Sequence, residues 1–201
     1  MEGASTMAND VRLAVFASGH GTNFAAILDA IQTQSLSCQI VRLVVDKANA
    51  GALAIAEAHN IPTLVVNYKA AGSRDVVEQE IITQLKDDGV QGILLAGYMR
   101  IITPKLLQAF PQKIVNIHPA LLPSFPGTHG IEDAFNYGVK VTGVTVHFVD
   151  EGTDTGQIID QQAVRITNDD TLASLETKIH DVEHHLYPAV LAQLLKEEVF
   201  N

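Results

Sequence analysis

Residues 11–31 read VRLAVFASGHGTNFAAILDAI, and this stretch decides the fold. Residues 11–17 form an apolar run that predicts a buried strand. From Thr22 onward the spacing is helical, and one side of the predicted helix collects the apolar side chains Phe24, Ile27, Leu28 and Ile31. Gly19 and Gly21 lie between the two segments. A strand that passes through a glycine turn into a helix is typical of an α/β protein.

The same alternation continues along the chain. Further strands are predicted at 39–45, 62–66, 92–96 and 113–117, and further helices at 51–59, 75–86 and 104–110. Each strand is apolar throughout, which indicates a parallel sheet covered on both faces. The segments 140–149 and 156–166 are rich in Val, Ile and Thr, so we expect an antiparallel pair, followed by an amphipathic helix at 172–196. The predicted fold is a three-layer, Rossmann-like open α/β sheet, mostly parallel, with antiparallel strands in its C-terminal part.

Composition narrows the class of protein. The chain has 201 residues, 47% of them hydrophobic and 18% charged, which is the balance of a globular domain. We expect a single domain over residues 11–201, preceded by a flexible extension at residues 1–10. The net charge of -10 argues against a nucleic-acid partner, and no apolar run is long enough to span a membrane. Cys38 is the only cysteine, so disulfides play no part and the chain is expected to be cytoplasmic.

Ligands of open α/β sheets bind beyond the carboxyl ends of the strands. The loops expected to form the site are 18–23, 46–51, 97–100, 118–129 and 150–155. Within them, residues 114–123 read IVNIHPALLP, and the spacing of Asn116 and His118 points both side chains to one face of a strand. An amide can hold a developing oxyanion, and an imidazole can donate to it or carry a proton. Pro119 should break the strand and leave His118 at its lip, although a buried Asn and a capped His at an ordinary strand end would look the same.

The turn at residues 18–23 favours an anion. Its two glycines let backbone N–H groups approach a ligand, and the N-terminus of the following helix favours negative charge. Phe24 occupies the place of the third glycine of a dinucleotide-binding turn, so a single phosphate is a better match than a pyrophosphate. A tight turn capped by Thr22 or Asn23 is the alternative that needs no ligand.

Two other loops contribute candidate binding and catalytic residues at the carboxyl edge of the predicted sheet. Arg100 follows the fourth strand and could pin a carboxylate or phosphate, while Met99, Ile101 and Ile102 could line a flat aromatic ligand or pack in the core. A carboxylate of the acidic loop 150–155 could pair with His118, orient it and raise its pKa, although a solvated acidic turn fits the sequence equally well.

Residues 180–184 read HDVEH and match a metal-binding H-x-x-E-H motif. No third ligand is evident, so we expect no metal and interpret the segment as part of a packing helix. Glu183 then remains available for a contact with a substrate.

Four segments together resemble the folate-dependent formyltransferases, in order from about residue 11 to 195. They are SGHGTN at 18–23, GYMRI at 97–101, NIHPALLP at 116–123, and HFV at 147–149 followed by Asp154. The phosphate turn and the absence of extra domains resemble the members that formylate glycinamide ribonucleotide. The resemblance implies transfer of the formyl group of 10-formyltetrahydrofolate to the amine of 5-phosphoribosylglycinamide, giving formylglycinamide ribonucleotide in purine biosynthesis. Both partners are then small molecules, and the resemblance allows a homodimer.

The resemblance also assigns residues by position. Asn116, His118 and Asp154 match the catalytic residues. The ribonucleotide is expected at Gly21, Thr22, Asn23 and Glu183, and the formyl-folate at Arg74, Met99, Arg100, Ile101, Ile102 and Asn116. Residues 11–110 would be the phosphate-binding half of the domain, and 111–201 the catalytic and folate-binding half. His20 stands where Asn is frequent and could add a phosphate contact, and Ala120 stands where Ser is usual and lacks its hydroxyl.

Two other functions stay open at this point. Hydrolysis of the formyl-folate would use the same catalytic residues but has no use for a phosphate turn. A phosphate-binding module without catalysis would need only the sheet and the turn.

Overall fold

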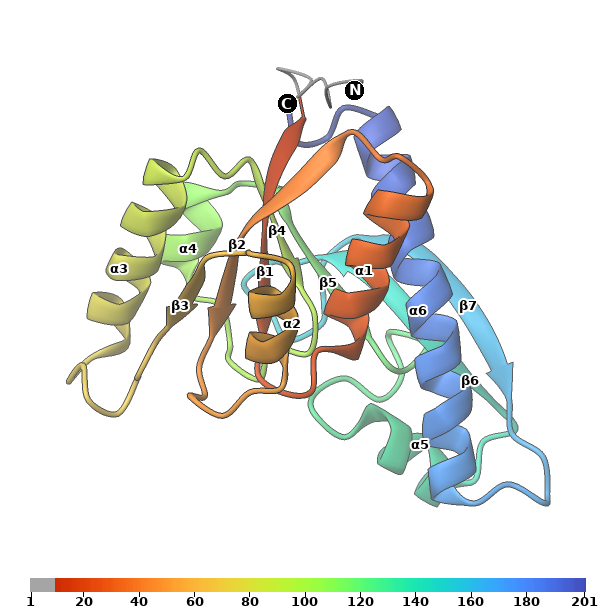
Figure 1. The fold of residues 1–201 in the computed structure, drawn as a ribbon. Helices are drawn as coiled ribbons and strands as arrows, with labels where there is room; N and C mark the ends of the chain where they lie inside the picture. Colours follow the sequence, from red (N-terminus) through yellow and green to blue (C-terminus); the bar gives the residue numbers. More distant parts are fainter. Residues whose placement is uncertain (1–9) are drawn as a thin grey trace.

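The computed structural model describes residues 10–201 (Figure 1). Apart from Asp10, the extension expected at residues 1–10 lies outside the described part. The described residues form one seven-stranded sheet with the order β3-β2-β1-β4-β5-β6-β7. The strands are β1 (Val11–Ala17), β2 (Cys38–Val45), β3 (Thr63–Val65), β4 (Gly92–Leu95), β5 (Ile114–His118), β6 (Val141–Phe148) and β7 (Ile158–Arg165). The helices are α1 (Thr22–Thr33), α2 (Ala52–Ala58), α3 (Arg74–Asp87), α4 (Pro104–Ala109), α5 (Gly130–Tyr137) and α6 (Leu172–Lys196).

The strand directions confirm the predicted fold class. Strands β1 to β5 pair in parallel, whereas β6 runs antiparallel to both β5 and β7. The change of direction occurs at β5, the strand that carries Asn116 and His118. The parallel half brings the loops after β1 and β4 to one edge of the sheet, beside the end of β5.

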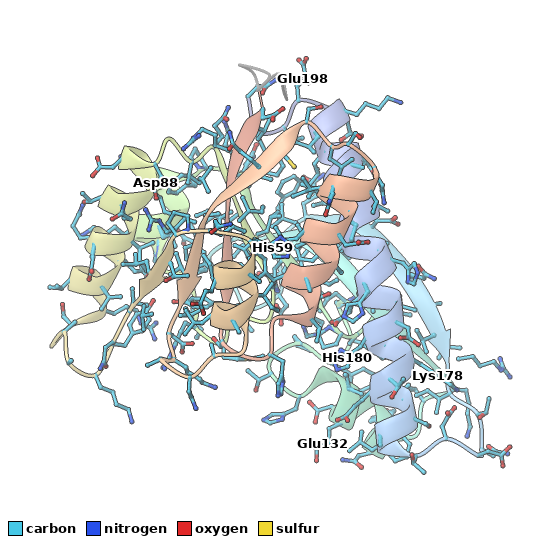
Figure 2. The ribbon with its side chains drawn as sticks, in the orientation of Figure 1. His59, Asp88, Glu132, Lys178, His180 and Glu198 are labelled. Carbon is cyan, nitrogen blue, oxygen red and sulfur yellow. The ribbon has the colours of Figure 1, made fainter. Side chains whose placement is uncertain are left out.

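Helices cover both faces of the sheet (Figure 1). One core cluster joins the sheet to α1, α2 and α6, with Phe24, Ile27, Leu175 and Leu191 among its members. The second cluster joins the opposite face to α3 and α4. None of the helices in residues 10–201 combines the length and apolar character that a bilayer crossing requires. Figure 2 shows His180 on α6 and Glu132 near α5, both toward the end of the molecule where β1 leads into α1.

Helix α5 was not predicted. It begins at Gly130, contains only eight residues, and ends at Tyr137, where it is capped by Gly138 with a left-handed backbone of φ 82°. Ile131, Ala134 and Phe135 have helical spacing, but the segment is only two turns long, and Tyr137 near its end is 80% exposed. It nevertheless matters for the site, because it covers the end of β5.

The acidic loop 150–155 starts at a different place from the one expected. Because β6 is antiparallel to β5, its last residues lie beside the beginning of β5, and Val149 N–H donates to the carbonyl of Ile114 at 2.9 Å. The loop therefore turns back along the sheet to bring Asp154 to His118, rather than extending from a carboxyl edge that it shares with β5.

Candidate active site

A single cleft of about 660 Å³ collects nearly all of the expected site residues. Its volume lies in the range of sites for small molecules. Four loops line it: the turn after β1, the segment after β4, the loop after β5 and the acidic loop after β6; α6 supplies another wall. Of the residues expected to bind or react, the cleft is lined by Gly21, Thr22, Asn23, Met99, Arg100, Ile101, Ile102, Asn116, His118, Asp154 and Glu183.

The turn after β1 presents an open helix N-terminus to the cleft. Gly21 precedes α1 with a left-handed backbone of φ 83°, and a Cβ at this position would lie 2.8 Å from atoms of Ala52. Only glycine combines that conformation with so close a neighbour. No side chain of the described residues caps this N-terminus, so the expected cap by Thr22 or Asn23 is not formed. The first backbone N–H groups of α1 are then available to an anion.

Asn23 and Glu183 connect this turn to α6. The amide of Asn23 donates to Oε2 of Glu183 at 3.0 Å, and Nδ1–H of His180 donates to the same oxygen at 3.0 Å. Glu183 is only 5% exposed. Its hydrogen bond is the main cause of the raised pKa of His180, outweighing partial burial of the imidazole. Glu183 is therefore paired with Asn23 and His180, and among residues 10–201 no group of three or more His, Cys, Asp or Glu side chains is arranged to hold a metal ion.

The segment after β4 forms a largely apolar rim with one cation. Met99 and Ile101 are 57% and 64% exposed at the cleft, which is unusual for apolar side chains of this size. The side chain of Arg100 is fixed by Asp46, whose Oδ2 accepts a hydrogen bond from Nε of Arg100 at 2.6 Å. The guanidinium of Arg100 also lies over the ring of Tyr68, 5.2 Å from its centroid. The rim therefore offers an apolar surface beside a fixed positive charge.

Arg74, the remaining residue expected at the folate site, does not line the cleft. It begins α3 and is exposed. Arg74 and Arg100 are both close enough to Tyr68 to act electrostatically on its hydroxyl. The structure therefore leaves Arg74 beside the cleft without bringing it to the cleft wall.

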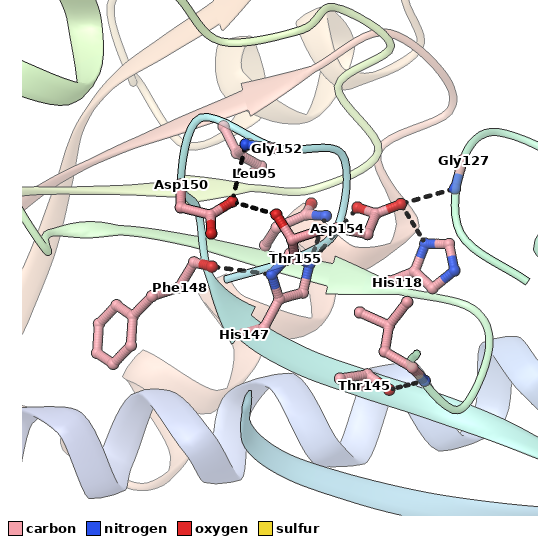
Figure 3. A network of polar contacts seen from close by, with 12 residues as sticks. Leu95, His118, Gly127, Thr145, His147, Phe148, Asp150, Gly152, Asp154 and Thr155 are labelled. Atoms are coloured by element: carbon pink, nitrogen blue, oxygen red, sulfur yellow. Dashed lines mark hydrogen bonds and ion pairs between the residues drawn. The ribbon is translucent and has the colours of Figure 1, made fainter. Parts of the chain in front are cut away.

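Asn116, His118 and Asp154 all line the cleft, and Asp154 contacts His118. Figure 3 shows the carboxylate of Asp154 pointing between the imidazole of His118 and the amide of Gly127. Oδ2 of Asp154 lies 3.4 Å from Nδ1 of His118 and accepts from Gly127 N–H at 2.7 Å. The pairing of the acidic loop with His118 that the sequence suggests is therefore formed.

The sequence predicted that His118 would be exposed at the end of β5. The structure shows instead that its side chain is buried, with only 3% exposed. The carbonyl of Phe125 accepts from Nε2–H at 2.8 Å, and a Cβ on Gly130 would come within 3.2 Å of the same nitrogen. The predicted rise in the pKa of His118 is wrong. Burial lowers its pKa more than the charge of Asp154 and the Phe125 carbonyl raise it. Both ring nitrogens therefore face protein partners.

The pKa of Asp154 is held below its usual range. Burial is the largest single influence and would raise this pKa. Three neighbours lower it by more than burial raises it: the His147 imidazole, the Gly127 amide and the charge of His118. Asp154 has a left-handed backbone with φ of 55°, and Asp150 steadies the loop by accepting from Gly152 N–H and the Thr155 hydroxyl. The carboxylate is therefore ionised and aimed at the imidazoles.

His147 is the site residue that the sequence-based assignment missed. It lies 2% exposed on β6, and its Nε2 is 3.2 Å from Nδ2 of Asn116. The sequence contained two signals: His147 begins the HFV segment, one of the four that resemble the family, and it is a polar residue near the end of an apolar strand. Only the register of β5 against β6 shows that the two side chains meet.

Comparison with known proteins agrees with this geometry. Residues 11–191 match the family model described as formyl transferase. The chain is 48% identical over 184 residues to phosphoribosylglycinamide formyltransferase of Bacillus subtilis (strain 168), covering 92% of this chain and 94% of that protein. It is 41% identical over 180 residues to the human trifunctional purine biosynthetic protein adenosine-3, covering 90% of this chain but only 18% of that longer protein.

A solved structure supports the same relationship. The crystal structure of phosphoribosylglycinamide formyltransferase from Bacillus halodurans superposes with a TM-score of 0.90 at 49% identity, covering 92% of this chain and 95% of that one. A family match over most of the chain, at this level of identity and with the same fold, assigns the protein: this chain belongs to the formyl transferase family.

Proposed function

We propose that this chain transfers the formyl group of 10-formyltetrahydrofolate to the amine of 5-phosphoribosylglycinamide, giving formylglycinamide ribonucleotide in purine biosynthesis. The observation that carries the proposal is the combination of features in one cleft. An uncapped helix N-terminus, an apolar rim with Arg100, and the side chains of Asn116, His118 and Asp154 all line this one cleft. A phosphorylated amine and a flat aromatic formyl donor would meet at those three residues.

The phosphate of the ribonucleotide fits the N-terminus of α1. Backbone N–H groups at Gly21, Thr22 and Asn23 would hold it, because the helix dipole and open donors favour an anion there. Glu183 would contact the same substrate from α6, fixed in place by Asn23. His20 is exposed on the turn and also lines the cleft, so it is available for a further phosphate contact.

The formyl-folate would occupy the rim. Met99, Ile101 and Ile102 would contact its aromatic part, and Arg100 would pair with a carboxylate of the ligand. Arg74, just outside the cleft, would meet the distal part of the same ligand.

The reaction would develop a negative charge on the formyl oxygen, and the Asn116 amide would donate a hydrogen bond to it. The amine nitrogen attacks the formyl carbon, and the carbonyl oxygen becomes a tetrahedral oxyanion that accepts from the Asn116 amide. His118 would donate to the same oxyanion from Nε2–H once that group is released from the Phe125 carbonyl, and Asp154, 3.4 Å from Nδ1, would stabilise the positive charge that develops as the ring takes up a proton. Catalytic hydrogen bonds commonly tighten only in the substrate complex.

Collapse of the intermediate completes the transfer. The bond between the formyl carbon and the folate nitrogen breaks, and the proton lost by the amine ends on that leaving nitrogen. Asp154 and His118 would relay the proton, so the step requires no metal. We expect the reaction to take place in the cytoplasm.

One assay separates this proposal from its competitors. The protein is incubated with 10-formyltetrahydrofolate in the presence and absence of 5-phosphoribosylglycinamide, and release of tetrahydrofolate is followed. Release that depends on the amine supports the transferase. Equal release without the amine would make the protein a formyl-folate hydrolase, and no release with either mixture would leave a phosphate-binding module.

A further inference from the structure

His147 occupies a position that the proposed reaction does not yet explain. It is buried beside the three proposed catalytic residues, and its ring has a protein neighbour on each nitrogen (Figure 3). Nδ1 lies 2.9 Å from the carbonyl oxygen of Phe148, and Nε2 lies 3.2 Å from Nδ2 of Asn116. Asp154 Oδ1 is 3.6 Å from Nε2, beyond the range of a hydrogen bond.

The sheet itself brings His147 and Asn116 together. The two residues are directly opposite each other in the antiparallel pairing of β5 with β6, so their side chains lie on the same face. On its other side, the pairing of β6 with β7 shifts between Val146 and His147, where Val146 pairs with Asp160 and His147 with Ile158. Such an irregularity bends a strand locally and redirects a side chain.

The partners of the ring determine where its proton lies. The Phe148 carbonyl can only accept, so Nδ1 must carry a hydrogen and donate to it. In the neutral imidazole, Nε2 then has a free lone pair, and its hydrogen-bond partner is the amide nitrogen of Asn116, which donates. A second proton on Nε2 would point at that N–H group, whereas the Asp154 carboxylate, the acceptor that would favour such a proton, lies 3.6 Å away and beyond hydrogen-bond range.

This hydrogen bond sets the orientation of the Asn116 amide. One N–H group is directed to His147, and the second N–H group of the same nitrogen remains for the cleft, which both residues line. With the amide reversed, the side-chain oxygen of Asn116 would take the position of its nitrogen. An oxyanion next to that oxygen would be repelled rather than stabilised.

We propose that His147 is a positioning residue whose neutral, Nδ1-protonated imidazole orients Asn116 as the oxyanion donor. The inference rests on the proposed formyl transfer for its catalytic consequence. The hydrogen-bond arrangement stands apart from any activity, and the two parts can therefore be tested separately.

The protonation of the ring is tested in the wild-type protein. Nitrogen-15 NMR of the histidine side chains, with His147 assigned by comparison with the His147→Gln spectrum, distinguishes protonated from unprotonated ring nitrogens. We expect Nδ1 to be protonated and Nε2 unprotonated at neutral pH. A ring protonated at Nε2, alone or with Nδ1, overturns the inference whatever the activity of the protein.

Kinetics test the catalytic consequence. His147→Leu removes the acceptor and should lower kcat by about 10²-fold, with each KM within about threefold of the wild-type value. His147→Gln, whose side-chain oxygen can accept from Asn116, should recover most of that loss. Because His147 acts through Asn116, the double variant His147→Leu/Asn116→Ala should be no slower than Asn116→Ala alone.

Controls separate the possible failures. His59→Leu makes the same chemical change at an exposed position at the end of α2 and should leave kcat unchanged. Equal impairment of the Gln and Leu variants of His147, or multiplied losses in the double variant, would overturn the positioning role. A wild-type protein without amine-dependent transfer would instead refute the proposed function, and the catalytic part of this inference with it.

Discussion

The side-chain amide of Asn23 donates a 3.0 Å hydrogen bond to Glu183 across a sequence separation of 160 residues. It joins the turn at the start of α1 to the middle of α6, and both side chains are buried. The turn would therefore keep its shape before any ligand arrives. Preorganisation of this kind reduces the entropic cost of binding.

Replacement of Glu183 by Ala should weaken both the fold and the ribonucleotide site. The buried amide of Asn23 would lose its acceptor, which should lower the free energy of unfolding by about 1–3 kcal/mol. KM for 5-phosphoribosylglycinamide should rise more than KM for the formyl-folate. Chemical denaturation and initial-rate kinetics measure the two effects. Asp181→Ala removes an exposed carboxylate from the same helix and should change neither; an equal rise of both KM values in Glu183→Ala would contradict the assignment.

Asn116→Ala and Asp154→Asn should each lower kcat by about 10²–10³-fold while the protein stays folded. The first variant removes the proposed oxyanion donor, and the second removes the charge that faces His118. Single-turnover kinetics with both substrates, together with circular dichroism, measure these effects. Asp160→Asn, an exposed change on β7, is the matched control. Turnover close to that of the wild type in either site variant would refute the corresponding role.

Asp46→Asn should selectively weaken binding of the formyl-folate. The carboxylate of Asp46 is 1% exposed and fixes Nε of Arg100 at 2.6 Å, so its loss releases the guanidinium from its place at the rim. KM for 10-formyltetrahydrofolate should rise several-fold, with little change in KM for the ribonucleotide. Asp88→Asn breaks a comparable ion pair with Arg42, away from the cleft, and should leave both KM values unchanged. A variant of Asp46 with normal folate KM would show that Arg100 needs no such support.

His118 and His180 should make opposite contributions to the pH dependence of stability. The pKa of His118 is lowered in the folded protein, so its contribution to the free energy of unfolding is complete above the ordinary value of 6.5 and is lost as the pH falls below it. The pKa of His180 is raised, so its contribution is complete below 6.5 and is lost as the pH rises through the raised value.

Denaturation of two variants at several pH values tests these signs. Between about pH 8 and pH 5.5, the loss of stability on acidification should be smaller in His118→Asn than in the wild type. In His180→Asn it should be larger, although modestly, because that side chain is half exposed. If the free energy of unfolding depended on pH in the same way in both variants and the wild type, the pKa shifts of His118 and His180 would be contradicted.

Local patterns were sufficient to predict most of the fold. Apolar runs such as residues 11–17 and the helical spacing of Phe24 and Ile27 depend on near neighbours in the chain, so the parallel sheet and its helices follow from them. Helix α5 was missed because it contains only eight residues, so its helical spacing extends over just two turns. Because this helix was not predicted, His118 was expected to be exposed. In the structure, Gly130 and the loop that precedes it bury the His118 side chain.

The site depends more strongly on contacts between distant segments. Asn116 and His118 were found from their spacing on one strand, but the partnership of Asn116 with His147 depends on strand register across 31 residues. The direction of the His118 pKa depends on how far burial outweighs the charge of Asp154, and spacing in a sequence contains no measure of burial.

The acceptor for Nε2 of His118 is a main-chain carbonyl, that of Phe125, whose backbone is left-handed with φ of 54°. Mutation can change the side chain at position 125 without deleting this acceptor. Evolutionary drift there would therefore be tolerated only among residues that accept a left-handed backbone, of which glycine, asparagine and aspartate are the most permissive.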